Sequence, residues 1–213
     1  MVKYKKIMLI SLAATILIFI SGLILGGSLD DSRINELVEN LNQNELNSES
    51  YLVEKEFVTN FGGNKCESSK ARINELTKEL GKLGPLLLKY ESKSIFKETE
   101  FDYLKRKYFL LEIKTYNLLS SLKKECNYDI KIILFFYDKD DTNSIRQGYI
   151  LDSLVASNKN LYIFSFDRLF NVDPALETVK IHYNINSSPT LIINNDLKKE
   201  GLTLLENLKE ILI

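Results

Sequence analysis

The chain has 213 residues, a formal net charge of −1 and 45% hydrophobic residues, which is enough apolar sequence for a folded core. The near-neutral charge argues against a general nucleic-acid-binding protein, because such proteins carry a clear basic excess. With two cysteines and one histidine, the chain lacks the ligands for a structural zinc site built from Cys and His. We find no phosphate-binding loop and no nucleophile elbow, and therefore expect no cofactor.

The N-terminal segment has the composition of a membrane anchor. Residues 7–27 contain no charged side chain, three lysines precede them within residues 1–6, and two aspartates follow shortly after. A helix needs about 20 apolar residues to cross the hydrocarbon core, and positive charge in front of it places the N-terminus in the cytoplasm. We therefore predict a single-pass membrane protein, with a transmembrane signal-anchor helix at residues 7–27 and an extracytoplasmic C-terminal domain.

Two features of this segment bear on its processing and assembly. A cleavable signal peptide has a shorter apolar region of about 7–15 residues and ends in a small-x-small site. The sequence Leu25-Gly26-Gly27-Ser28 matches such a site poorly, so we expect that the anchor is not cleaved. Gly22 and Gly26 have the GxxxG spacing that lets two membrane helices approach closely, which makes a homodimer the alternative to a monomer.

Residues 28–127 are predicted to form a helical stalk that contains an antiparallel hairpin. Two apolar stripes recur with alternating steps of three and four residues, as in the paired helices of a coiled coil. The first stripe consists of Ile73, Leu76, Leu80, Leu83, Leu87 and Tyr90, and the second of Phe101, Leu104, Tyr108, Leu111, Thr115, Leu118 and Leu122. The connection near residue 96 is short, so the helices should be antiparallel neighbours. Gly81, Gly84 and Pro85 are expected to interrupt the first helix, because proline kinks or restarts a helix.

The two cysteines flank this hairpin symmetrically. Cys66 lies at the start of the first helix and Cys126 at the end of the second, with their midpoint at residue 96. An antiparallel hairpin with this tip brings the two thiols together at its open end, and disulfides persist in extracytoplasmic compartments. We therefore predict a structural disulfide between Cys66 and Cys126. The alternatives are two unrelated buried thiols and a redox-active pair, which the long separation and the lack of a Cys-x-x-Cys motif disfavour.

From residue 130 onward the pattern alternates between strands and helices. Apolar runs rich in β-branched and aromatic residues predict strands at residues 130–137, 161–166, 191–193 and 197–199. Helices are predicted near residues 144–157, after Asp173, and at the C-terminus. Asn143 or Ser144 is expected to cap the first of these helices, and Asp173-Pro174 is a strong start for the second.

The order βαβαββα, with Ser187-Ser188-Pro189-Thr190 just before the third strand, resembles the thioredoxin fold over residues 128–213. In that family a cis-proline faces the redox loop, and Pro189 matches it. The expected fold class is therefore α/β, a thioredoxin-like domain preceded by a transmembrane helix and an α-helical hairpin.

The chain departs from this family at the redox loop. The resemblance places the two redox cysteines of the family near Asp141 and Ser144, between the strand that ends at Tyr137 and Gln147-Gly148. Thiol–disulfide exchange requires an attacking thiolate and a resolving thiol, and neither Asp141 nor Ser144 supplies one. We therefore do not expect the oxidoreductase activity of the family.

The resemblance instead implies a binding function, because relatives hold an extended peptide beside the cis-proline by main-chain pairing. The expected partner is a protein or peptide rather than a nucleic acid. The residues predicted to line this groove are Tyr137, Asp138, Asp141, Ser144, Ser188 and Pro189.

Three alternatives remain open at this point. The chain could act in extracytoplasmic disulfide chemistry, as a thiol–disulfide oxidoreductase that uses Cys66 and Cys126 or as an accessory to one. It could instead be a structural protein whose helical hairpin is the interaction surface. The loop with Asp138, Asp140 and Asp141 has the oxygen ligands that a hard cation prefers, although we expect a solvated turn there.

Overall fold

The computed structural model describes residues 65–93, 98–158 and 160–212, together with residues 10–22 and single or short runs of residues between positions 4 and 59. The chain divides into two compact units, Met1–Gln43 and Asn44–Ile213. We describe each unit by itself.

The prediction of a transmembrane helix at residues 7–27 is wrong. In the first unit, residues 10–22 form the longest continuous run of described helix. This run is shorter than the ~20 residues that a membrane span requires. Within the part of the chain that the structure describes, no helix is both long and apolar enough to cross a membrane. Gly26, the second glycine of the proposed dimer contact, lies outside the described residues.

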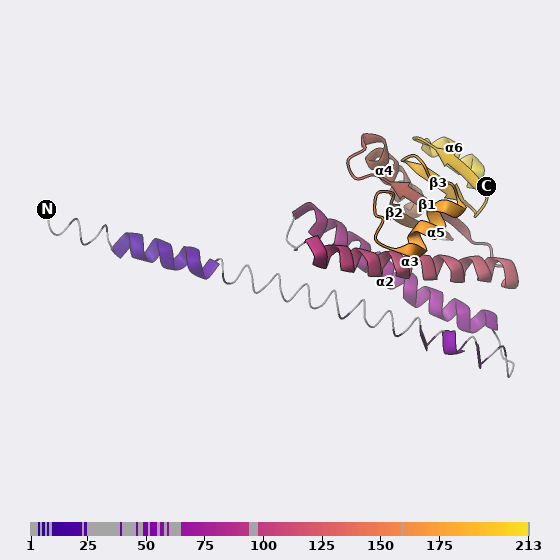
Figure 1. The fold of residues 1–213 in the computed structure, drawn as a ribbon, viewed down its shortest axis with the longest axis horizontal. Helices are drawn as coiled ribbons and strands as arrows, with labels where there is room; N and C mark the ends of the chain where they lie inside the picture. Colours follow the sequence, from indigo (N-terminus) through magenta and orange to yellow (C-terminus); the bar gives the residue numbers. More distant parts are fainter. Residues whose placement is uncertain are drawn as a thin grey trace. The chain divides into compact units, whose positions relative to one another are not determined.

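The second unit contains two long helices that lie side by side (Figure 1), α2 (Lys65–Lys93) and α3 (Glu98–Cys126). A disulfide joins the start of α2 to the end of α3, which makes the two helices antiparallel, as predicted. The helix α2 continues through Pro85, so the expected interruption there is wrong. The predicted stripe of α2 is buried at Ile73, Leu76, Leu80, Leu83 and Leu87.

The second unit continues with a four-stranded sheet and three helices. The elements are β1 (Lys131–Tyr137), α4 (Thr142–Ser157), β2 (Leu161–Asp167), α5 (Pro174–His182), β3 (Thr190–Ile193), β4 (Leu197–Glu200) and α6 (Leu205–Leu212). The strand order is β2-β1-β3-β4, with β1 parallel to β2 and antiparallel to β3, and β4 antiparallel to β3. This element order and sheet topology are those of a thioredoxin-like fold, as the sequence predicted.

Each face of the sheet is covered by helices (Figure 1), which explains why β1 is a continuous apolar run. On one face Ile133 and Phe135 of β1 pack with residues of α4 and α6, including Leu154 and Leu208. On the other face the Phe136 and Phe166 rings lie 5.6 Å apart between centroids, and Phe109 of α3 meets Phe166 edge to face at 5.7 Å. The helix α3 therefore forms part of the core of the α/β fold.

The helix α3 carries two buried stripes, and the sequence analysis assigned only one of them. The second stripe has the same alternating steps and consists of Lys105, Phe109, Glu112, Tyr116 and Leu119. It faces the β2 side of the sheet. Lys105 Nζ lies 2.7 Å from an Asp167 carboxylate oxygen, and Arg106 Nε lies 2.7 Å from Asp173. The predicted boundary between a stalk at residues 28–127 and a domain at residues 128–213 stays a prediction, but α3 packs against elements on both sides of it.

Candidate functional site

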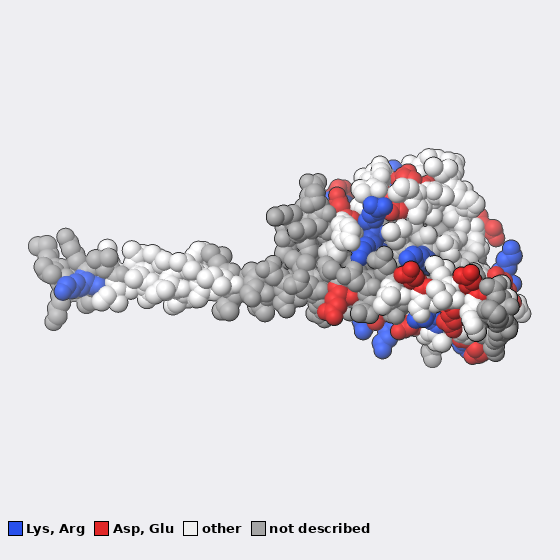
Figure 2. All heavy atoms as spheres, turned by 60° about the horizontal axis from the view of Figure 1, so that its bottom comes forward, with Lys and Arg blue, Asp and Glu red and all other residues white. Residues whose placement is uncertain are grey.

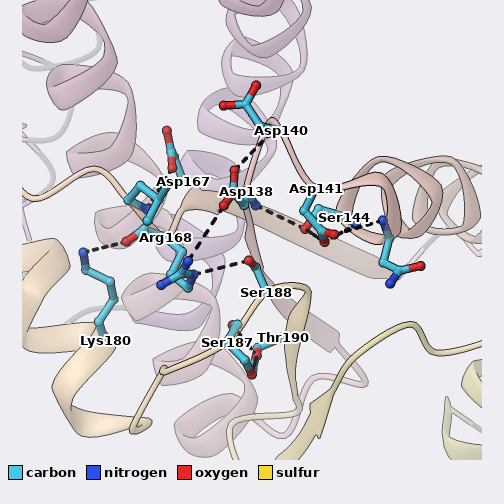
Figure 3. A network of polar contacts seen from close by, with 12 residues as sticks. Asp138, Asp140, Asp141, Ser144, Asp167, Arg168, Lys180, Ser187, Ser188 and Thr190 are labelled. Carbon is cyan, nitrogen blue, oxygen red and sulfur yellow. Dashed lines mark hydrogen bonds and ion pairs between the residues drawn. The ribbon is translucent and has the colours of Figure 1, made fainter.

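Three loops meet at one edge of the sheet. The strands β1 and β2 are parallel and in register from Lys131 opposite Leu161 to Tyr137 opposite Asp167, so their carboxyl ends lie together. The strand β3 runs antiparallel to β1, which brings its first residue, Thr190, opposite Phe136 near the same end. The loops that follow β1 and β2 and the loop that precedes β3 therefore face one another (Figure 3).

The loop after β1 forms a helix cap at the place where the family carries its dithiol. Asp141 is the N-cap of α4, and its carboxylate accepts hydrogen bonds from the backbone N–H of Asn143 and of Ser144, at 3.3 and 2.8 Å. The expectation that Asn143 or Ser144 itself caps this helix is therefore wrong. The Ser144 hydroxyl donates to Asp141 Oδ2 at 2.8 Å, and this bond, followed by the Ser144 N–H, holds the pKa of Asp141 below its ordinary value. Both positions that the resemblance assigned to cysteines serve this cap.

Ser144 also orders the residues just before the cap. Its side chain is buried, and its Oγ accepts a hydrogen bond from the Asp138 N–H at 3.2 Å. The Asp138 carboxylate in turn accepts from the Asp140 N–H at 3.0 Å. No group of three or more His, Cys, Asp or Glu residues arranged to hold a metal ion occurs among the described residues. The carboxylates of Asp138 and Asp141 thus both accept backbone N–H groups of the loop.

Arg168 connects all three loops (Figure 3). Its backbone N–H donates to the Tyr137 carbonyl at 2.8 Å, and its Nε donates to Ser188 Oγ at 3.3 Å. Its Nη2 lies 3.8 Å from Asp138 Oδ2, and 27% of the side chain is exposed. We call Asp138, Asp141, Ser144, Arg168 and Ser188 the polar corner. The sequence analysis missed Arg168, although a charged residue directly after a buried strand is a signal that could have drawn attention to it.

A buried lysine holds the loop that carries Arg168. Lys180 of α5 is 7% exposed, and its ammonium donates to the carbonyls of Arg168 and Phe170, both at 3.1 Å, and to Asn171 Oδ1 at 2.8 Å. Glu177 supplies the countercharge one turn earlier in the helix. A buried ammonium is stable only when it is paired and hydrogen-bonded, as it is here. Lys180 therefore holds the backbone of the loop at Arg168 in place through hydrogen bonds to its carbonyl groups.

The segment before β3 supplies the third wall of the polar corner. The Ser188–Pro189 peptide bond is cis, as the resemblance implied. The Thr190 hydroxyl donates to the Ser187 carbonyl at 2.7 Å, and the Gly201 N–H donates to the Pro189 carbonyl at 2.8 Å. Among the described residues, no group forms a hydrogen bond with the backbone N–H or carbonyl of Ser188.

Four of the six predicted groove residues lie at the polar corner, and Tyr137 and Pro189 are placed differently. Asp138, Asp141, Ser144 and Ser188 gather around this corner in Figure 3. Tyr137 is half-buried and packs on the side of α4 and α6, with its ring 5.7 Å from that of Phe135. Pro189 is buried.

The disulfide lies at the other end of β1. Cys66 and Cys126 are bonded, with their Cα atoms 5.8 Å apart, as predicted. These are the two cysteines of the chain. Cys126 lies just before β1 starts, whereas the polar corner follows its last residue, and a strand of 7 residues spans about 20 Å. The sulfur atoms therefore lie far from the position of a family redox centre.

Several solved structures are similar to part of this chain. No family model and no curated protein matches the chain. Three similar solved structures are described as a malarial protein, chloroplastic thioredoxin z, and thioredoxin-2 of the malaria parasite protein secretion machinery. Their identities are 21%, 18% and 21%, and each has a TM-score of 0.34. The matches cover 38%, 42% and 38% of this chain and 92%, 81% and 80% of the respective neighbours. The thioredoxin-like assignment rests on the strand order and helix placement of this chain itself.

Proposed function

We propose that the protein binds an extended segment of another protein at the polar corner, by main-chain pairing with Ser188. The observation that carries this proposal is the backbone of Ser188, whose N–H and carbonyl have no partner among the described residues. Ser188 is half-buried, and backbone groups that are shielded from water in folded proteins are nearly always paired. An extended peptide satisfies both groups at once, because one of its residues offers a carbonyl and an N–H side by side.

The chemistry of the polar corner supports binding over disulfide exchange. The Asp141–Ser144 cap lies across the polar corner from Ser188 (Figure 3), and neither side chain can form a mixed disulfide. Both cysteines of the chain are joined to each other at the far end of β1. In an insulin-reduction assay, the full chain is therefore expected to give no turnover above buffer, and sustained turnover would favour the oxidoreductase alternative.

Backbone modification of the ligand tests the main-chain pairing. The full chain is screened against an array of short peptides of alternating small and β-branched residues, and the tightest binder is resynthesised with single N-methyl groups. N-methylation of the peptide residue that pairs with Ser188 is expected to weaken binding of the peptide about tenfold, because one hydrogen bond is removed and the Ser188 carbonyl is left unpaired.

Neighbouring residues of the same peptide provide the control. Successive N–H groups of an extended strand point in opposite directions, so methylation of the adjacent residue should change the affinity little. Equal losses at every position, or none at any, would show that the peptide is not held through the main chain of Ser188.

We also propose that the second unit works in an oxidising compartment. The support is the Cys66–Cys126 disulfide, since such bonds are rare where glutathione and thioredoxin keep thiols reduced. Alkylation of the native protein followed by mass spectrometry, with and without prior reduction, tests this. A joined Cys66–Cys126 peptide that disappears on reduction is expected, whereas two freely alkylated thiols would contradict the proposal.

A further inference from the structure

We propose that Arg168 makes the polar corner selective for a carboxylate on the bound segment. This inference rests on the proposed function and adds the chemical class of the partner. Three observations support it: the guanidinium lies beside Ser188, its contacts are long, and the nearby acids are bonded to other groups.

The guanidinium of Arg168 is held in place but is not saturated by the contacts of the described residues. It has five N–H donors in one plane. Its contacts are the 3.3 Å bond from Nε to Ser188 Oγ and the 3.8 Å ion pair from Nη2 to Asp138. The second distance exceeds that of a direct hydrogen bond. With 27% of the side chain exposed, the fork can accept a bidentate carboxylate, the geometry that arginine favours.

The acids near Arg168 are committed to other groups. Asp141 caps α4, and one oxygen of Asp138 accepts the Asp140 N–H. The Asp140 carboxylate is directed away from Arg168 in Figure 3. Asp167, the residue before Arg168, is paired with Lys105. The acid that competes for Arg168 is therefore Asp138. A ligand carboxylate could approach the guanidinium more closely than the 3.8 Å between Arg168 Nη2 and Asp138 Oδ2.

Discrimination between ligands at the polar corner would depend on single side chains rather than on a large charged surface. On the face drawn in Figure 2, Lys and Arg side chains are interspersed with Asp and Glu over the second unit, with no large area of one sign. On this face, charge complementarity to a ligand comes from single side chains close to it, where the reduced solvent exposure strengthens them. Arg168 meets this condition, because it donates to the hydroxyl of Ser188, the residue whose backbone would pair with the ligand. A side chain of a segment paired with Ser188 would therefore come within reach of the guanidinium.

Matched peptides test the selectivity. The probes are one extended peptide with an acetylated N-terminus and an amidated C-terminus, synthesised with Glu, Gln or Lys at the centre. A fourth probe carries Gln at the centre and a free C-terminal carboxylate. The full chain is expected to bind the Glu peptide about tenfold more tightly than the Gln peptide, the size of one charge-assisted bidentate contact. A preference for the fourth probe would keep the carboxylate specificity and assign it to a chain end.

Two variants separate the roles of the charges. Arg168→Gln should bind the Glu and Gln peptides with equal affinity, because the charge that distinguishes the two peptides is removed. Asp138→Asn removes the competing acid and should raise the ratio of Glu-peptide to Gln-peptide affinity severalfold.

The outcomes distinguish the two proposals. Equal binding of the Glu and Gln peptides by the wild type, or a preference for Lys, would overturn the role of Arg168 and leave binding at Ser188 intact. Failure of every probe and of the peptide array to bind would overturn the proposed function and the inference with it. A Glu preference that survives in Arg168→Gln would assign the selectivity to another residue.

Discussion

At the scale of single residues, Glu112 is an acid that the fold removes from water. It lies on the sheet-facing stripe of α3 with 2% of its surface exposed. Burial raises its pKa well above the ordinary value, and the hydrogen bond that Oε1 accepts from the Ser165 N–H, at 3.1 Å, opposes this only in part. Since β2 is an edge strand of the described sheet, this carboxyl group occupies an otherwise open strand edge.

The raised pKa of Glu112 predicts how stability depends on pH. The folded state holds the proton more tightly than the unfolded state, so the contribution is complete below the ordinary carboxyl pKa and is lost as pH rises through the raised one. In that window the wild type should lose up to about 1.4 kcal/mol of unfolding free energy per pH unit. The variant Glu112→Gln keeps an acceptor for the Ser165 N–H and should lack this loss.

Urea unfolding of both proteins across the weakly acid to weakly alkaline range measures the difference. The comparison with the variant is necessary because the pKa of Asp141 and that of Asp173 are lowered and act in the opposite direction at acid pH. For Asp173, burial raises the pKa but the Arg106 bond and the helix N–H groups outweigh it. Parallel pH profiles for the wild type and Glu112→Gln would show that Glu112 is not buried in its neutral form.

At the scale of elements, α3 joins the helical hairpin to the α/β fold. One of its stripes faces α2, and the other faces the sheet and α5. A helix that is apolar on more than one side belongs in a core rather than in a two-helix stalk. The steps of three and four from Phe109 to Glu112, Tyr116 and Leu119 were present in the sequence, but Lys105 and Glu112 concealed the stripe because charged residues usually mark a solvated face.

The close approach of α2 and α3 predicts the effect of one glycine substitution. A Cβ added at Gly84 would lie 2.7 Å from the Tyr108 hydroxyl oxygen, whereas one added at Gly81 meets nothing within 4 Å. Gly81→Ala should therefore stabilise the protein by about 1 kcal/mol, the helix-propensity gain. Gly84→Ala should give no gain in the wild type and should regain it in a Tyr108→Phe background, where the hydroxyl is absent.

Denaturant unfolding of the four single and double variants provides the measurement. The coupling between positions 84 and 108 is the quantity of interest, since it cancels the separate cost of losing the tyrosine hydroxyl. Equal effects of Gly84→Ala in the two backgrounds would mean that the helices do not approach at this point.

Local sequence patterns predict most helices and strands, whereas contacts between residues distant in the sequence have no local signal. The apolar run of β1, the Asp173-Pro174 start of α5 and the spacing of the two cysteines each have a local or symmetric signal. The cap at Asp141 was assigned two or three residues late, because Asp, Asn and Ser all cap helices and four such candidates stand close together. Lys180 gave no signal, since two of its partners are backbone carbonyls that only the folded loop brings near. At the N-terminus, the run of uncharged residues predicts one membrane-spanning helix, whereas the longest described helical run covers residues 10–22.

At the scale of the whole molecule, the disulfide closes a loop that contains most of the hairpin. It links residues 60 apart in sequence and lies where α3 leads into β1. By the chain-entropy relation, a loop of this length stabilises the folded state by about 4 kcal/mol, less any strain. The helix α3 also contacts β2 through Phe109 and Lys105, which lie well before Cys126 in the helix.

The double variant Cys66→Ser/Cys126→Ser is therefore expected to fold and to unfold at lower denaturant. The loss should be about 2–4 kcal/mol by urea unfolding, with an unchanged far-ultraviolet circular dichroism spectrum. A reducing agent should shift the wild type toward the variant and leave the variant unaffected. Identical stabilities of the oxidised wild type and the double variant would contradict the role given to this bond.

The most direct test of the proposed function is hydrogen exchange of single amides, measured by nuclear magnetic resonance with and without the Glu peptide. The Gly201 amide, which donates to the Pro189 carbonyl, serves as the internal control and should be protected in both states. The Ser188 amide should exchange rapidly in the free protein and at least about tenfold more slowly in the complex. Binding that leaves the Ser188 amide unprotected, or that protects only amides of α2 and α3, would contradict pairing at the polar corner and make the helical hairpin the interaction surface.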